Sequence, residues 1–131
     1  MVNPTSEQLN DLSHEIIGAA LEVHKHLGPG LLEAVYEDCM VVELQRRGIH
    51  VERQVQRPII YKGANIGHPL VIDLLVESCV IVELKAVRDI SDLHAAQLLS
   101  YLRLSDLKLG LLINFNCVRL QDGLKRIVNK L

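Results

Sequence analysis

Three charged side chains stand inside two largely apolar segments, LVIDLLVE at 70–77, which ends in Glu77, and VIVELKAV at 80–87. Asp73 interrupts the first segment, and Glu83 and Lys85 interrupt the second. Two carboxylates that are held close together repel each other, and a hard divalent cation such as Mg²⁺, which takes oxygen ligands, would offset that repulsion. A lysine beside the cation can orient a water molecule or stabilise negative charge that develops on a phosphate. The three residues are therefore candidates for metal-assisted chemistry.

The spacing of the two segments predicts which of these side chains meet. Alternation along a strand would place one apolar face at Leu70, Ile72, Leu74 and Val76, and a second, mixed face at Val71, Asp73, Leu75 and Glu77. A hairpin with a three-residue loop at 77–79 would pair Val76 with Val80 and set Asp73 directly opposite Glu83. A two-residue loop would send the two carboxylates to opposite faces. Only an odd loop also matches the apolar faces of both strands.

An exposed sheet face is the simpler explanation of the same pattern, because charges in water cost little. The neighbours on the charged faces count against it, since they are aliphatic: Val71, Leu75, Ile81 and Val87. The local pattern by itself leaves both interpretations open.

The elements that must position these residues follow from apolar periodicity and turn signals. Thr5 and Gln8 have the spacing of a capping box, and the helix that they begin is expected to end at Gly28-Pro29-Gly30. The remaining expected elements are a helix at about 31–47, β segments at 49–61, 66–76 and 80–87, a helix from 91 or 92 through about 104, a strand at 109–115 and a short closing helix at 122–131. This order, α-α-β-β-β-α-β-α, predicts a mixed sheet with helices packed on it.

Composition sets the class of protein. The chain has 131 residues, which fits a single domain over 1–131. The sequence contains neither a run that is apolar enough to cross a membrane nor a secretory signal, and its three cysteines have no metal-binding spacing, so we expect a cytoplasmic protein with free thiols and no membrane partner. The net charge of −2 and the scarcity of aromatic residues predict that any nucleic-acid binding relies on a local basic patch and not on base stacking.

Asp73 followed by Glu83-Leu84-Lys85 resembles the signature of the PD-(D/E)XK nuclease superfamily, with Ile72 in place of the nominal proline. The α-β-β-β-α-β order is similar to the core of that superfamily. The segment 30–36, GLLEAVY, resembles the motif that names the GxxExxY proteins, and this resemblance covers almost the whole chain. The segment 97–101, QLLSY, resembles an element found in RecB-like nucleases. The resemblance implies a restriction-endonuclease-like αβββαβ core, here with an extra N-terminal helix and a short C-terminal helix.

The resemblance also implies roles for particular residues. Asp73, Glu83 and the backbone carbonyl of Leu84 would bind Mg²⁺, for which Mn²⁺ would substitute, and Lys85 would assist the attacking water. An acidic residue on the second helix, either Glu33 or Glu37, would complete the site. Gln97 would orient it from the third long helix, with Tyr101 one turn away on the same side.

Two functions are compatible with these expectations. The first is a Mg²⁺-dependent nuclease that hydrolyses phosphodiester bonds in DNA, working as a homodimer or with a partner protein that targets it. The second is a nuclease-like domain that has lost catalysis and binds nucleic acid or protein. Asp73, Glu83 and Lys85 favour the first, because a decayed site has no reason to keep charges inside a strand, whereas the net negative charge favours the second.

Overall fold

The structure, a computed structural model, describes residues 3–131. Its three α-helices are α1 (Ser6–Leu27), α2 (Glu33–Arg46) and α3 (Asp92–Ser105), and a 3₁₀ turn, η1, spans Leu120–Gly123. Its strands are β1 (Val51–Arg57), β2 (Ile60–Tyr61), β3 (Ala64–Asn65), β4 (Leu70–Val76), β5 (Val80–Lys85), β6 (Leu109–Asn114) and β7 (Leu124–Val128). Within residues 3–131, no helix is both long and apolar enough to cross a membrane.

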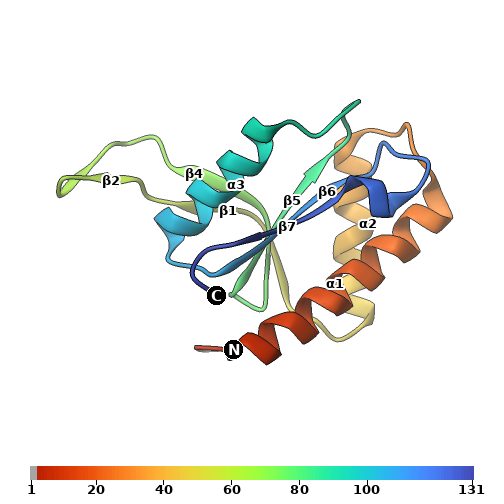
Figure 1. Ribbon diagram of the computed structural model, residues 1–131, viewed down its shortest axis with the longest axis horizontal. Helices are drawn as coiled ribbons and strands as arrows, with labels where there is room; N and C mark the ends of the chain where they lie inside the picture. The colour runs from red at the N-terminus through yellow and green to blue at the C-terminus, as the bar shows by residue number, and fades with distance from the viewer. Residues whose placement is uncertain (1–2) are drawn as a thin grey trace.

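Five strands form one mixed sheet in the order β1-β4-β5-β6-β7, and β2 and β3 form a separate two-stranded ribbon. The pair β5–β6 is parallel, because α3 crosses over between these strands, and the other pairs in the sheet are antiparallel. Helices α1 and α2 cover one face of the sheet and α3 covers the other, as Figure 1 shows. The structure thus confirms the predicted mixed sheet with helices on it.

The long helices begin and end where the sequence signals place them. Thr5 caps α1 through the reciprocal bonds with Gln8, and Ser91 caps α3 through the equivalent bonds with His94. Gly28 ends α1 with a φ of 69°, a value that favours glycine. These boundaries confirm the predicted turn at 28–30.

The predicted closing helix at 122–131 is wrong. Residues 120–123 form the 3₁₀ turn, and the chain then continues as β7, which pairs antiparallel with β6 from Leu124 to Val128. Leu124 and Ile127 are partly buried, a spacing that fits a helix as well as an irregular edge strand. Residues 124–128 form a strand because the buried backbone N–H and C=O groups along the edge of β6 need hydrogen-bond partners.

The expected β segment at 49–61 is also interrupted. β1 ends at Arg57, directly before Pro58, and the chain leaves the main sheet until β4 begins at Leu70, directly after Pro69. Proline lacks the N–H that a strand ladder requires, so the two prolines bound an excursion of the chain. The chain reverses at Lys62-Gly63, at the tip of this excursion, where both residues have positive φ.

The predicted faces of β4 are wrong at one point. Leu74 and Val76 pack in the core under α1 and α2, whereas Leu70 and Ile72 pack in the core under α3. The alternation therefore shifts across Asp73. The neighbouring strand is distorted at the same level: Gln54 has a φ of 50°, and the pairing of β1 with β4 omits Gln54 and Asp73. A local irregularity of the sheet thus surrounds the first of the three candidate residues.

Candidate functional site

Asp73 and Glu83 contact each other's strand through their carboxylates. The predicted register is confirmed, since Val76 pairs with Val80 and the ladder continues to Leu74 and Val82. At the position along the strands that follows the pair Leu74–Val82, the N–H of Asp73 donates to Oε1 of Glu83 over 3.3 Å. The N–H of Leu84 donates to Oδ2 of Asp73 over 2.9 Å. Each carboxylate thus accepts from the partner strand's backbone, and the two acids lie side by side.

Glu83 is buried to an extent unusual for a carboxyl group, with 4% of its surface exposed. Burial, first, and then the neighbouring charge of Asp73 raise the pKa of Glu83 to about 9, while Lys85 acts in the opposite direction. Glu83 consequently keeps its proton at neutral pH unless a cation approaches. A buried acid whose pKa is displaced by burial and by a like charge is typical of a functional site.

Glu33 belongs to the same electrostatic cluster. It is the first residue of α2, and its pKa is raised by partial burial, then by the charge of Asp73, while Lys85 lowers it and Glu37 raises it. The charges of Asp73 and Lys85 therefore act on the Glu33 carboxylate, which is exposed at the start of α2.

Glu37, one turn further along α2, is bound by β1 instead. Its Oε2 accepts a hydrogen bond of 2.9 Å from Nη2 of Arg53, and its Oε1 accepts one of 2.6 Å from Nε2 of Gln54. Arg53 also pairs with Asp38. This network joins α2 to the distorted part of β1, so Glu37 is occupied in holding the helix against the sheet.

The turn before α2 is held by Tyr36, which is fully buried and stacks on Phe115 with the ring centroids 4.5 Å apart. Its hydroxyl donates to the carbonyl of Gly28 over 2.6 Å and accepts from the N–H of Leu31 over 3.1 Å. Tyr36 is therefore a packing residue with a bonded hydroxyl. By closing the 28–31 turn, Tyr36 places the first turn of α2, and with it Glu33, at the edge of the site.

Lys85 is the last residue of β5, and a side chain that the sequence analysis missed holds the backbone that follows it. Lys85 pairs with Asn114 on β6. The buried Asn114 amide accepts from the N–H of Val87 over 3.1 Å and donates to the carbonyl of Val87 over 2.9 Å. A polar residue that ends the apolar strand LGLLIN was the signal available in the sequence. Asn114 therefore continues the hydrogen bonding of β5 beyond Lys85.

Gln97 and Tyr101 approach the site from α3 to different extents. The Nε2 of Gln97 lies 3.5 Å from the hydroxyl of Tyr101, and the Gln97 side chain is exposed. The pKa of Tyr101 is raised by burial and then by the charges of Glu83 and Asp73, so the two acids act electrostatically on its hydroxyl. Gln97 is exposed beside Tyr101.

The donor atoms at this point are the right type for a hard divalent cation. Asp73 and Glu83 provide carboxylate oxygens, and Leu84 between Glu83 and Lys85 provides a backbone carbonyl. Among residues 3–131, no group of three or more His, Cys, Asp or Glu side chains is arranged as a metal site. A cation here would therefore rest on two carboxylates, with main-chain and water oxygens completing its shell.

Comparison with known families agrees with this geometry. The model of the PD-(D/E)XK nuclease superfamily matches residues 10–127, which include every element from α1 to β7 in whole or in large part. The match is to the superfamily, and the narrower GxxExxY resemblance stays a prediction. Searches of curated proteins and of solved structures found no significant match.

Proposed function

The chain belongs to the PD-(D/E)XK nuclease superfamily, and on that premise we propose that it is a Mg²⁺-dependent nuclease that hydrolyses phosphodiester bonds in DNA. The observation that carries the proposal is the contact between Asp73 and Glu83. Two acids held side by side, one of them buried, are costly to a fold that has no use for them.

Asp73, Glu83 and the carbonyl of Leu84 would hold the cation, and Mn²⁺ would substitute for Mg²⁺. When bound, the metal supplies a lowered pKa for a coordinated water and polarises the phosphate. Glu83 carries a proton at neutral pH in the free protein, because burial and the charge of Asp73 raise its pKa to about 9. Glu83 must release this proton to become a ligand, so metal affinity should increase with pH.

Lys85 and Glu33 provide the remaining chemistry. Lys85 follows the two potential ligands Glu83 and Leu84 directly, and its ammonium would orient the attacking water or stabilise the charge that develops on the phosphate. Glu33, on which the charges of Asp73 and Lys85 act, is the preferred acid from α2, since Glu37 is bound to Arg53. Gln97 would orient the substrate from α3 beside Tyr101.

Metal binding and cleavage test the proposal separately. Calorimetric titration with Mg²⁺ and Mn²⁺ should show one saturable site. Because binding releases protons, the observed binding enthalpy should be more exothermic in buffers of high ionisation enthalpy. Asp73→Asn should abolish both binding and Mn²⁺-dependent cleavage of plasmid DNA. Lys85→Ala should keep the metal and reduce cleavage on the order of 10²- to 10³-fold, the usual effect of removing one group that stabilises developing negative charge.

Glu22→Gln, a change on α1 outside the site, is the matched control and should leave binding and cleavage intact. A protein that neither binds the metal nor cleaves plasmid or branched DNA would refute the nuclease and favour the binding module instead.

A further inference from the structure

A narrow β-ribbon projects from the body of the molecule, and the mechanism above does not use it. This arm comprises residues 58–69 and is bounded by Pro58 and Pro69. Ile60 and Tyr61 pair with Asn65 and Ala64, and the N–H of Ile66 donates to the carbonyl of Ile59 over 3.1 Å. Residues 60–69 are all exposed, and Figure 1 shows the ribbon extending well beyond the other elements. Because residues 60–69 are exposed, this hydrogen-bonded ribbon is available to a partner.

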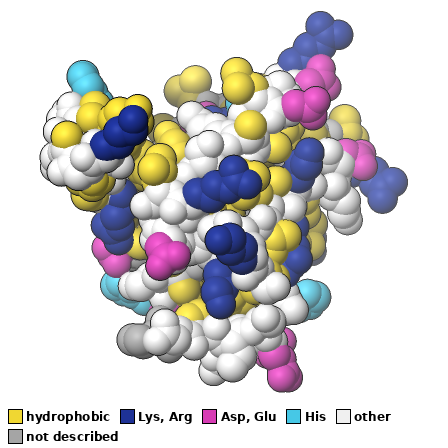
Figure 2. Space-filling view, turned by 60° about the vertical axis from the view of Figure 1, so that its left-hand side comes forward, with side chains coloured by type: hydrophobic (Ala, Val, Ile, Leu, Met, Phe, Trp, Pro, Cys, Tyr) yellow, Lys and Arg dark blue, Asp and Glu magenta, His cyan; other side chains and the backbone are white. Residues whose placement is uncertain are grey.

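The charge of the arm differs in sign from that of the chain. The whole chain has a net charge of −2, yet no acidic residue occurs between Glu52 and Asp73. Within that span Arg57, Lys62 and His68 are basic, and Lys62 at the tip holds its amine 5.3 Å from the centroid of the Tyr61 ring. Figure 2 shows dark blue and cyan side chains on this lobe, and further dark blue ones on the adjoining face of the body. The arm thus has no acidic residue and carries Lys62 at its tip among the exposed side chains of Ile60, Tyr61 and Ile66, and a charge of this sign suits an anionic partner.

The arm is also close to the site along the chain. It leads directly into β4, where Asp73 lies three residues after Leu70, a distance of about 10 Å along an extended strand. The same root is fixed by the pair Arg57–Leu70 and by Ile59, which packs against the core under α3. The base of the arm therefore lies on the same strand as Asp73, close enough for one polyanion to contact both.

We propose that the arm binds duplex DNA, with its two-stranded ribbon in the major groove beside the phosphodiester bond at Asp73; this inference rests on the proposed function. The major groove of B-form DNA, about 12 Å wide, admits a two-stranded ribbon. The major groove of A-form RNA is deep and too narrow for one. Lys62 at the turn contacts a phosphate or a base edge, and Tyr61 packs against the groove wall.

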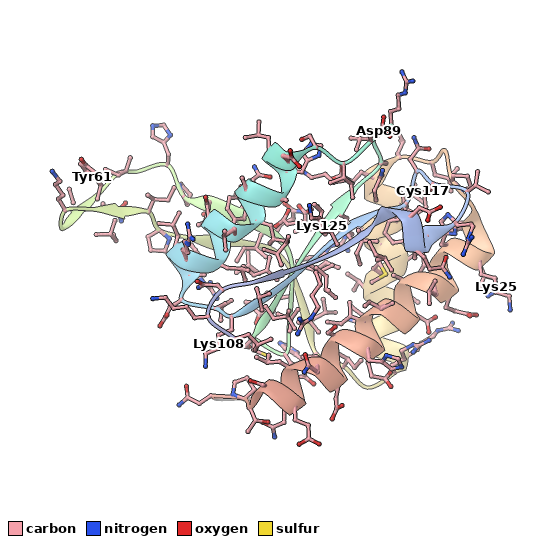
Figure 3. All side chains as sticks on the ribbon, viewed as in Figure 1. Lys25, Tyr61, Asp89, Lys108, Cys117 and Lys125 are labelled. Carbon is pink, nitrogen blue, oxygen red and sulfur yellow. The ribbon has the colours of Figure 1, made fainter. Side chains whose placement is uncertain are left out.

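Binding assays without catalysis test the arm by itself. A labelled DNA duplex of about 20 base pairs and its RNA counterpart are titrated with the protein in EDTA, and anisotropy gives the affinity at several salt concentrations. Lys62→Ala should weaken DNA binding about eightfold at 0.1 M salt and reduce the salt slope by about 0.9, the counterion-release contribution of one phosphate contact. Binding to duplex RNA should be unchanged. Lys25→Ala, at the opposite end of the molecule from Tyr61 in Figure 3, is the control and should change neither.

The outcomes separate the two proposals. Weaker DNA binding by Lys62→Ala in a protein that never cleaves would support the arm and refute the nuclease. Cleavage with equal DNA binding by Lys62→Ala and Lys25→Ala would refute the arm and leave the nuclease standing. Three other outcomes would overturn the arm as a groove contact. Lys62→Ala could weaken binding to DNA and to RNA equally, or the protein could bind neither duplex. Sedimentation experiments could also show a dimer that depends on Lys62 in a protein that does not bind DNA.

Discussion

Replacing Glu83 with glutamine should stabilise the metal-free protein, and the gain should depend on pH. In the folded protein, burial and the charge of Asp73 raise the pKa of Glu83 from 4.5 to about 9. As the pH rises above 4.5, the unfolded chain loses this proton while the folded chain keeps it. The free energy of unfolding therefore decreases with pH up to about 9 and is constant above it. Glutamine keeps the shape of the protonated acid and cannot titrate.

The size of the effect follows from the two pKa values. Each unit of pH between them changes the free energy of unfolding by about 1.4 kcal/mol, so at pH 7 the wild type is less stable than Glu83→Gln by about 3 kcal/mol. At pH 4.5 and below, the two proteins should differ little. The glutamine oxygen can still accept the N–H of Asp73, so the substitution preserves the hydrogen bond of 3.3 Å.

Urea denaturation in EDTA at pH 5, 6, 7 and 8 measures this difference directly. Contributions from all other groups cancel when the variant is compared with the wild type at each pH. Glu7→Gln, in the first turn of α1, reports the general effect of removing a surface carboxylate. A gap between the wild type and Glu83→Gln that stays constant from pH 5 to pH 8 would refute the argument. Saturating Mg²⁺ should then stabilise the wild type alone, by about 2.7 kcal/mol at a concentration of 100 times Kd.

The remaining predictions concern the residues that hold the site in place. Tyr36→Phe should lower the free energy of unfolding by about 1–3 kcal/mol, because the carbonyl of Gly28 loses its hydrogen-bond donor. Thermal unfolding measures this loss, and a Tm equal to that of the wild type would contradict the prediction. Asn114→Ala should cost a similar amount and should also speed hydrogen exchange at the N–H of Val87, which NMR resolves. Unchanged protection at Val87 would show that Asn114 does not hold this backbone.

Local sequence patterns determined much of the fold, because their causes are local. The capping box at Thr5 and Gln8 and the glycine at the end of α1 are decided within a few residues, so those helix limits were predictable. The same holds for the register of β4 with β5, since only a three-residue turn matches their apolar faces. The closing segment was not predictable, because the spacing of Leu124 and Ile127 fits two structures and the open edge of β6 selects between them.

The sequence by itself determined the register that sets Asp73 beside Glu83, because strand alternation and a short turn leave little freedom. Only the tertiary structure decided how the two candidate acids of α2 differ in their surroundings. Glu33 and Glu37 are equivalent on a helix face, and Arg53 and Gln54, from a strand distant in sequence, bind Glu37 and leave Glu33 in the field of Asp73. The buried contacts of Asn114 were likewise decided by packing. Charge pairing and burial depend on neighbours that only the folded chain supplies.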